Sequence, residues 1–269
     1  MIPLVLLDLD GTLIGEGGTV RPCVWDAAAA ARNAGVRLAV CTGRPGFGIA
    51  ARVARELDPD TPHIFQNGAQ VIYIDGDTVQ VSALRQRSTE RLVRHARERG
   101  LVLELYTPDA LYVERRTEIS TAHAKMIGVN AIVRDLAGVA ADEPVVRAQW
   151  VVGHDRIDEA LEIEVDGVDA GVATSPALKD TYFVSLTRTG VSKGSAATLL
   201  CKRLEIDPAH AMAVGDSLGD ASMLDAVGHP RVMGDAPAEM LARYPHHLGT
   251  TETCGAAAAL EEAVRARRR

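Results

Sequence analysis

The chain has 269 residues with a formal net charge of −7; 47% of the residues are hydrophobic and only 4% are aromatic. This length is enough for one large or two smaller cores, and the few aromatic residues predict cores built from Ala, Val, Leu and Ile. A mildly acidic chain without a lysine-rich run argues against nucleic acid and anionic membranes as partners.

The N-terminus and the cysteines indicate a cytoplasmic protein. No basic leader is present, Asp8 interrupts the first apolar stretch, and no apolar run of about 18 residues follows, so we expect neither a signal peptide nor a membrane span. The cysteines lack CxxC spacing, which favours reduced thiols over a disulfide framework or a zinc site; they are Cys23, Cys41, Cys201 and Cys254. The basic tail is expected to be a solvated helix end; it comprises Arg265, Arg267, Arg268 and Arg269.

Strands and helices alternate at the start of the chain. Strands are expected at 3–8, 36–41 and 63–65, with helices at 24–34 and 48–57 between them. Gly35 is a typical helix end. The order predicts a parallel sheet with helices on both faces, in which ligands bind beyond the carboxyl ends of the strands.

The middle of the chain has a different pattern. It predicts hairpin-like strands and helices of a separate α+β domain: strands 102–106, 111–115, 145–152, 171–173 and 182–186, and helices 88–99, 118–127 and 156–164. The alternating pattern then returns: helix 192–204 with Ser192 as N-cap, strand 211–214, helix 221–227, strand 231–233 and helix 236–244. We therefore expect an α/β core formed by residues 1–80 and 187–269, interrupted by an inserted domain over 81–186.

The segment LLDLDGT, residues 6–12, is the most informative motif. Asp8 and Asp10 follow a buried strand and, because side chains alternate along a strand, they are expected to leave on the same side. Two neighbouring carboxylates that lose hydration cost stability unless a cation or a substrate compensates. The alternative is a surface turn rich in Asp and Gly, but three further motifs follow in order.

These motifs also lie at expected strand or helix ends. Thr42 and Gly43 follow strand 36–41, where a hydroxyl and a free backbone N–H suit a phosphoryl oxygen. Lys193 starts a helix and favours a bound anion, although many such lysines are merely solvated. Asp216 and Asp220, in GDSLGD at 215–220, follow strand 211–214 and lie one helical turn apart.

Together the motifs supply four carboxylates and one lysine. Hard oxygen ligands with this charge favour Mg²⁺. No histidine belongs to the four motifs, which argues against zinc and against a histidine nucleophile. The remaining single histidines, His95, His123 and His154, are expected at the surface.

With DLDGT at 8–12, TGR at 42–44, Lys193 and GDSLGD at 215–220, the sequence resembles the haloacid dehalogenase (HAD) superfamily of phosphatases. The long segment between the second and third motifs resembles the Cof-type subgroup, which implies a Rossmann-like parallel-sheet core and a large inserted α/β cap. The sequences NGA at 67–69 and VMG at 232–234 are also similar to that subgroup.

The resemblance implies a role for each matching residue. Asp8 would be the nucleophile that forms an aspartyl-phosphate, and Asp10 would protonate the leaving oxygen and then deprotonate water. Thr42 and Lys193, with backbone N–H groups near Asp10 and Gly43, would hold the phosphoryl oxygens.

The other assignments concern the metal and the substrate. Asp8, the backbone carbonyl of Asp10, and Asp216 would bind Mg²⁺, and Asp220 would complete the shell directly or through water. Arg44 and Asn67 are further phosphate-binding candidates on the core side of the expected cleft. The sequence departs from the subgroup at Gly219, where Asn is usual, which predicts a looser metal site or slower turnover, and at Asp235, where Asn is also usual.

The expected function is therefore that of a phosphoric monoester hydrolase that uses Mg²⁺ to hydrolyse small phosphorylated metabolites, sugar phosphates first among them. A phosphotransferase or mutase with the same aspartyl-phosphate is the alternative, and a non-catalytic sensor would be expected to lack Asp8 or Asp10. The sequence leaves the individual substrate and the oligomeric state open.

Overall fold

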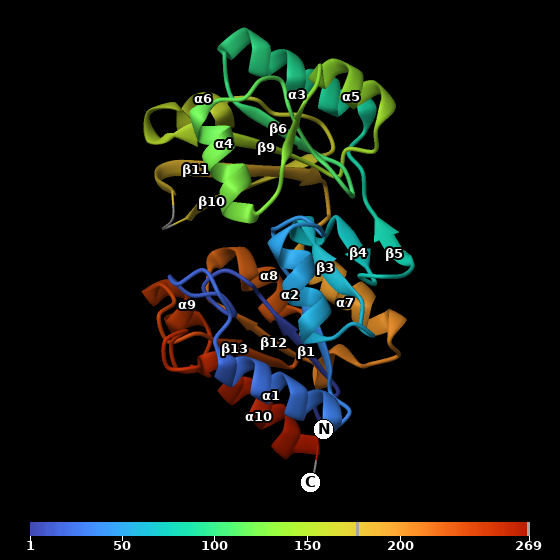
Figure 1. Ribbon diagram of the computed structural model, residues 1–269, viewed down its shortest axis with the longest axis vertical. Helices are drawn as coiled ribbons and strands as arrows, with labels where there is room; N and C mark the ends of the chain where they lie inside the picture. Colours follow the sequence, from blue (N-terminus) through green and yellow to red (C-terminus); the bar gives the residue numbers. More distant parts are fainter. Residues whose placement is uncertain (176–177, 268–269) are drawn as a thin grey trace. The chain divides into compact units, whose positions relative to one another are not determined.

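The chain divides into two compact units in a computed structural model that describes residues 1–175 and 178–267 (Figure 1). The first unit comprises Met1–Gly43, Arg52–Val79 and Ser192–Arg269, and the second comprises Arg44–Ala51 and Gln80–Val191. The segment Arg44–Ala51, expected in the core, thus groups with the second unit.

A four-stranded parallel sheet forms the centre of the first unit. Its order is β13-β12-β1-β2, and the strands are β1 (Leu4–Leu7), β2 (Arg37–Val40), β12 (Met212–Gly215) and β13 (His229–Val232). All four residues of β1 and of β12 are buried, as both faces of a parallel sheet are covered. The carboxyl ends of β1, β2 and β12 therefore lie side by side.

Helices cover both faces of this sheet (Figure 1). On one face α1 (Pro22–Asn33) and α10 (Gly255–Arg267) pack against each other and against the strands. On the other face α7 (Lys193–Arg203) and α8 (Ala221–Asp225) contribute small and aliphatic side chains to a core that includes Leu4 and Leu6. Smaller elements complete the unit: α2 (Ile49–Leu57) from Arg52 onward, α9 (Ala238–Arg243), η3 (Pro208–His210) and η4 (Leu218–Asp220).

Strand β3 (His63–Phe65) forms at the predicted residues, but most of its pairing lies outside the parallel sheet. It pairs antiparallel with β4 (Gln70–Ile72) in a sheet of order β3-β4-β5, where β5 is Thr78–Val81, and one parallel bridge from Cys41 to Ile64 connects it to the end of β2. The turn η1 (Gln66–Gly68) reverses the chain, because Gln66 and Asn67 adopt φ of 55° and 56°. Local turn geometry, which the strand pattern does not reveal, made this a hairpin.

The second unit is built on a mixed six-stranded sheet of order β10-β11-β9-β6-β7-β8 in which only β7 and β8 pair in parallel. Its strands are β6 (Leu103–Tyr106), β7 (Leu111–Val113), β8 (Ala131–Val133), β9 (Arg147–Gly153), β10 (Val168–Ser175) and β11 (Leu178–Arg188). Its helical elements are α3 (Gln86–Arg99), α4 (Glu118–Ile127), α5 (Leu136–Asp142), η2 (His154–Arg156) and α6 (Ile157–Leu161). The expected α+β character is confirmed, whereas β8 and α5 were not predicted.

The two faces of this second sheet differ in chemistry. One face contributes Leu103, Leu105 and Trp150 to an apolar core. The other carries Glu104, which is fully buried and accepts hydrogen bonds from Tyr106 Oη at 2.7 Å and His123 Nδ1 at 2.9 Å. The expectation that His123 lies at the surface is therefore wrong, because α4 covers this polar face.

The cysteine prediction is also wrong for one pair. Cys23 and Cys254 form a disulfide, whereas Cys41 and Cys201 are buried free thiols. The disulfide partners are 231 residues apart in sequence and meet because α1 and α10 pack together, so their spacing carries no signal. At the basic tail, Arg265 lies 3.5 Å from Glu261 on α10, and Arg268 and Arg269 lie outside the described residues.

Among the residues that the structure describes, none of the helices combines the length and the apolar run needed to cross a membrane.

Candidate active site

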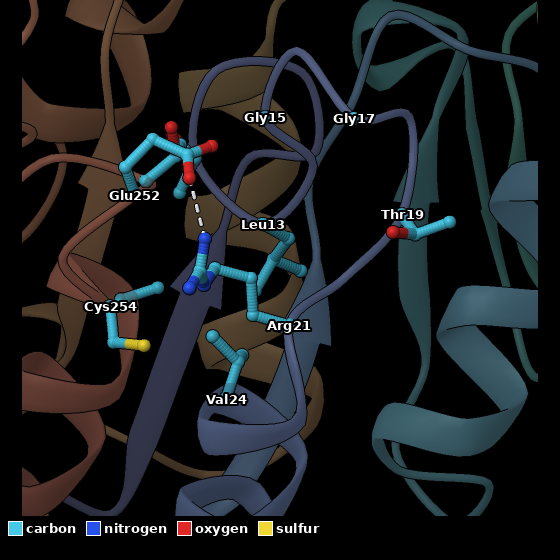
Figure 2. Close-up of a pocket in the computed structure, with 11 residues that line it drawn as sticks. Leu13, Gly15, Gly17, Thr19, Arg21, Val24, Glu252 and Cys254 are labelled. Atoms are coloured by element: carbon cyan, nitrogen blue, oxygen red, sulfur yellow. Dashed lines mark hydrogen bonds and ion pairs between the residues drawn. The ribbon is translucent and has the colours of Figure 1, made fainter.

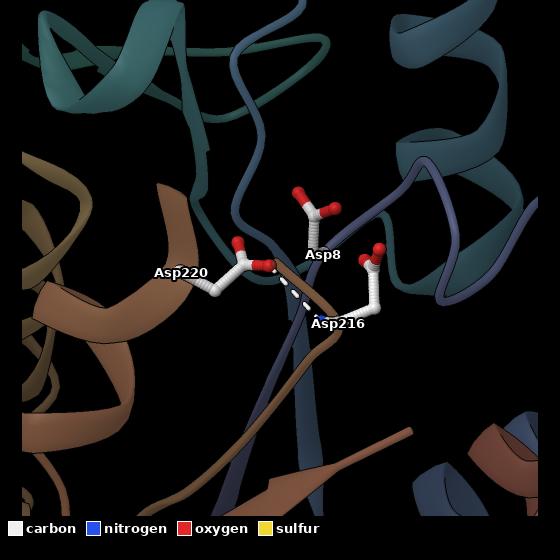
Figure 3. Close-up of side chains that lie close together, drawn as sticks. All are labelled: Asp8, Asp216 and Asp220. Atoms are coloured by element: carbon white, nitrogen blue, oxygen red, sulfur yellow. Dashed lines mark hydrogen bonds between the residues drawn. The ribbon is translucent and has the colours of Figure 1, made fainter. Parts of the chain in front are cut away.

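Three carboxylates gather at the carboxyl ends of β1 and β12 (Figure 3). Asp8 follows β1 and its backbone N–H donates to Val214 O at 2.9 Å, which aligns the ends of the two strands. Asp216 follows β12, and Asp220 ends the short turn η4. Each of the three side chains offers an oxygen within 4.8 Å of the others.

Lys193 lies between two of these carboxylates. Its Nζ is 2.6 Å from Asp8 Oδ1 and 2.6 Å from Asp220 Oδ1, and its side chain is only 7% exposed. The predicted N-cap is confirmed: Ser192 accepts a hydrogen bond from Ser195 N–H, and Ser195 Oγ accepts one from Ser192 N–H. This capping box fixes the start of α7 and therefore the direction of the Lys193 side chain.

Both carboxylate oxygens of Asp220 accept hydrogen bonds. Oδ1 accepts from Lys193, while Oδ2 accepts from the N–H of Asp216 at 3.1 Å and from the N–H and hydroxyl of Ser217, each at 3.0 Å. A Cβ at Gly219 would meet Ser217 Oγ at 3.4 Å, so the position has room for a side chain but Asp220 is oriented without one. Backbone N–H groups and the Ser217 hydroxyl therefore fix Asp220.

Asp216 is positioned by the loop that follows Asp8. Thr12 Oγ1 donates to Asp216 Oδ1 at 3.1 Å. Gly11 adopts φ of +80°, and a Cβ there would lie 2.2 Å from Asp216 Oδ2. Only glycine allows this loop to come so close to the carboxylate.

Burial and the close approach of these carboxylates shift the pKa values of Asp8 and Asp216. Burial, with the charges of Asp220, Asp216 and Asp10, raises the pKa of Asp8 well above its ordinary value, although Lys193 lowers it. Burial and the charge of Asp220 raise the pKa of Asp216 to about 7, opposed by the hydrogen bond from Thr12. A cation bound here would compensate the negative charge and lower the pKa values of both carboxylates.

The donor set fits a hard divalent cation. Carboxylate oxygens of Asp8 and Asp216 lie close together, and no nitrogen or sulfur ligand belongs to the group found among the described residues. Both oxygens of Asp220 already accept hydrogen bonds, so direct coordination by it would break existing contacts. The side chain of Asp10 is exposed, and its charge acts on Asp8 and Asp216.

The residues predicted to bind phosphate fall into two groups. Thr42 is buried, its N–H donates to Ile64 O at 2.9 Å, and its carbonyl accepts from Asn67 N–H at 3.1 Å. A Cβ at Gly43 would lie 2.8 Å from Asn67 Oδ1, so Thr42, Gly43 and Asn67 form one cluster. Arg44 belongs to the second unit.

Sequence reasoning gave no role to Thr12 or Ser217, which orient Asp216 and Asp220. Ser217 was detectable, since a Ser three residues before an Asp is a capping-box pattern. The partner of Thr12 is 204 residues away in sequence, so only the tertiary structure reveals it.

Comparisons with known proteins identify the family of this chain. The sequence matches the haloacid dehalogenase-like hydrolases over residues 5–260. It is 26% identical over 281 aligned residues to a Bacillus subtilis protein named "Putative phosphatase YxeH", covering 99% of this chain and 100% of that one. It is 25% identical to a Streptococcus pyogenes protein also named "Putative phosphatase", covering 90% of this chain and 92% of the relative.

The fold is likewise similar to solved structures. The HAD subclass IIB sugar phosphatase BT4131 superimposes with a TM-score of 0.80 at 19% identity, covering 96% of this chain and 98% of that chain. At this identity the likeness shows the Rossmann-like core and the mixed-sheet cap. The family match over nearly the whole sequence, together with the acidic cluster, shows that the chain belongs to the haloacid dehalogenase-like hydrolases, a family of phosphatases and phosphotransferases.

Proposed function

We propose that this enzyme is a Mg²⁺-dependent phosphatase that hydrolyses small phosphorylated metabolites through an aspartyl-phosphate on Asp8. The observation that carries the proposal is the position of Asp8, buried at the end of β1 with its Oδ1 2.6 Å from Lys193 Nζ. A buried carboxylate beside a fixed cation is suited to receive an anionic phosphoryl group, because positioning and charge neutralisation dominate this chemistry.

The first step forms a bond between a carboxylate oxygen of Asp8 and phosphorus, and the bond from phosphorus to the ester oxygen breaks. Asp10 donates a proton to that leaving oxygen. In the second step Asp10 takes a proton from water, whose oxygen attacks phosphorus and releases Asp8 and inorganic phosphate. Lys193, the hydroxyl of Thr42 and backbone N–H groups near Asp10 and Gly43 would stabilise the phosphoryl oxygens.

Asp8, Asp216 and the backbone carbonyl of Asp10 would hold Mg²⁺. The ion supplies charge neutralisation that keeps Asp8 ionised and compensates the phosphoryl charge. Asp220 acts mainly by fixing Lys193 and the backbone of Asp216, since both its oxygens are engaged, and any contact of Asp220 with the ion would run through water.

Sugar phosphates are the proposed substrate class. The support is the fold likeness to a sugar phosphatase, which is an analogy of fold. Asn67 beside Gly43, and Arg44, are the proposed further contacts to the phosphate. A cytoplasmic site of action is part of the proposal, although a disulfide such as Cys23–Cys254 is uncommon in that compartment.

Phosphate release from a panel of sugar, nucleotide and cofactor phosphates, with Mg²⁺ and with EDTA, tests this proposal. We expect Mg²⁺-dependent release by the parent protein and none by Asp8→Asn, which preserves shape but removes the nucleophile. Asp26→Asn, at an exposed position on α1, is the matched control and should keep full activity.

An active Asp8→Asn variant would contradict the nucleophile assignment. Phosphoryl transfer to an added sugar, without release of phosphate, would instead favour the phosphotransferase or mutase alternative.

A further inference from the structure

We propose that the Cys23–Cys254 disulfide is a thiol-exchange site, and that a low-molecular-weight thiol which opens it loosens the loop carrying Asp8, Asp10 and Thr12. The effect on the metal site rests on the function proposed above, whereas the exchange reaction does not.

The two cysteines of the disulfide are accessible to solvent, whereas the two free cysteines are not. Cys23 and Cys254 are both partly exposed, and Cys254 lines a cavity of about 160 Å³ (Figure 2). Arg21 and Glu252 line the same cavity and pair with each other, so the charge of the guanidinium group is compensated there. Cys41 and Cys201 are fully buried, so a thiol reagent should distinguish the two pairs.

Two segments line the cavity and approach each other closely. They are the β1–α1 loop and the turn that precedes α10. Besides the disulfide, Arg21 Nη1 pairs with Glu252 Oε2 at 2.5 Å, and a Cβ at Gly15 would lie 2.9 Å from Thr251 Oγ1 (Figure 2). The ion pair is largely exposed and therefore weak, so the disulfide is the strongest of these attachments.

The loop connects this attachment to the carboxylates. Backbone hydrogen bonds from Leu13 and Ile14 to Leu9 O, and from Gly11 to Ile14 O, make residues 9–14 a compact turn. Thr12 in this turn donates to Asp216 Oδ1 at 3.1 Å. Movement of the loop away from residues 250–254 would therefore weaken a hydrogen bond that orients a proposed metal ligand.

The exchange reaction is balanced by the thiol itself. The thiolate attacks one sulfur of the disulfide, the S–S bond breaks, and the second cysteine leaves as a thiolate that takes a proton. A second molecule of thiol resolves the mixed disulfide, so that two thiols become one small disulfide and the protein gains two thiols. Excess small disulfide drives the reverse reaction.

The first measurement is maleimide labelling of the native protein after equilibration in glutathione redox buffers, read by mass spectrometry. We expect labels on Cys23 and Cys254 only under reducing conditions, with Cys41 and Cys201 labelled only after unfolding. A disulfide that glutathione cannot open in the native protein would overturn the proposal.

The second measurement compares Mg²⁺ affinity of the oxidised and reduced protein by calorimetric titration, with circular dichroism to check the fold. Loss of an outer hydrogen-bond partner of a metal ligand typically weakens affinity by about 10–100-fold. Loosening the loop without removing Thr12 should therefore weaken Mg²⁺ binding by up to about 10-fold. The double variant Cys23→Ser/Cys254→Ser should have the Mg²⁺ affinity of the reduced protein, and dithiothreitol should not change it. The Mg²⁺ affinity of Cys201→Ala should change with dithiothreitol as that of the parent does.

Equal Mg²⁺ affinity in both redox states, or unfolding on reduction, would overturn the inference. A protein that releases no phosphate from any compound but still changes Mg²⁺ affinity with thiols would refute the proposed function and leave this inference intact.

Discussion

Lys193 shares one ammonium group between two buried carboxylates, Asp8 and Asp220. Removing one partner of a buried charged set is costly because the remaining charges stay unpaired. Under the proposed mechanism, the same residue would serve both the resting site and the incoming phosphoryl group.

We expect Lys193→Ala to lower kcat by roughly 10²–10³-fold, because one charge-assisted contact to the transferring group is lost. Lys202→Ala, at an exposed position near the end of the same helix, should be neutral. Steady-state phosphate release from both variants checks this, and a Lys193→Ala variant with the parent kcat would exclude contact between Lys193 and the reacting group.

As a proposed Mg²⁺ ligand, Asp216 is expected to make metal binding dependent on pH. Its pKa is raised to about 7, mainly by burial and by the charge of Asp220, so in the metal-free protein it is largely protonated below that pH. Since a cation competes with this proton, Mg²⁺ affinity should rise with pH through about 7, and Asp8, whose pKa is also raised, should extend the rise to higher pH. Calorimetric titrations from about pH 5.5 to about pH 8.5, roughly 1.5 units on either side of 7, measure how Mg²⁺ affinity changes with pH. A flat profile would contradict the assignment of Asp216 as a metal ligand.

Among the elements, the turn η1 supports the start of α7. Gly68 adopts φ of +99°, and a Cβ there would lie 2.2 Å from Ser192 O, next to Lys193. Gly68→Ala should therefore combine backbone strain with a displaced helix start, costing more than about 1 kcal/mol of unfolding free energy and lowering activity.

Gly18→Ala is the matched control for this substitution. Gly18 adopts φ of +69°, but a Cβ there meets nothing within 4 Å. Gly18→Ala should therefore introduce backbone strain without displacing a neighbouring element. Urea unfolding and phosphate release separate the two effects, and equal losses in both variants would rule out the displacement of α7.

His63 joins β2 to the segment before β3. Val40 N–H donates to Nδ1 at 3.0 Å, so Nε2 carries the proton and donates to Asp58 O at 2.8 Å. Burial lowers the pKa of His63 to about 4 from its usual 6.5.

This lowered pKa predicts a pH-dependent stability. Between pH 6.5 and about 4 the unfolded chain binds the extra proton, so the stabilisation is complete above pH 6.5 and is lost as the pH falls toward 4. The loss should reach roughly 3 kcal/mol. Urea unfolding of the parent and of His63→Gln from about pH 4 to about pH 7, the range spanned by these two pKa values, isolates the contribution of His63 to stability. If stability changed with pH equally in both proteins, His63 would be excluded as the source.

At the scale of the whole molecule, the disulfide closes a loop of 231 residues and ties the two ends of the first unit together. Cross-linking such distant positions restricts the unfolded chain. The double variant Cys23→Ser/Cys254→Ser should therefore lose about 2–4 kcal/mol of unfolding free energy. Urea unfolding under oxidising conditions measures the loss, with Cys201→Ala as a control that lacks a disulfide change; a double variant as stable as the parent would show that the bond does not stabilise the fold.

The alternation of apolar runs with helical patterns was enough to predict the parallel sheet and the inserted α+β unit. It predicted β3 but not its antiparallel partner β4, because the left-handed backbone of Gln66 and Asn67 that forms the hairpin leaves no mark on strand periodicity. It also missed β8 and α5, which are only 3 and 7 residues long.

By itself, the sequence predicted that Asp8, Thr42 and Asp216 would lie near one another, because each follows a strand and parallel strands present their carboxyl ends at one edge. Only the tertiary structure decided how they interact. It placed Lys193 between Asp8 and Asp220, directed Thr12 to Asp216, and joined Cys23 to Cys254. These contacts span 185, 204 and 231 residues of sequence, and such distances are fixed by the packing of helices on the sheet, which no local pattern records.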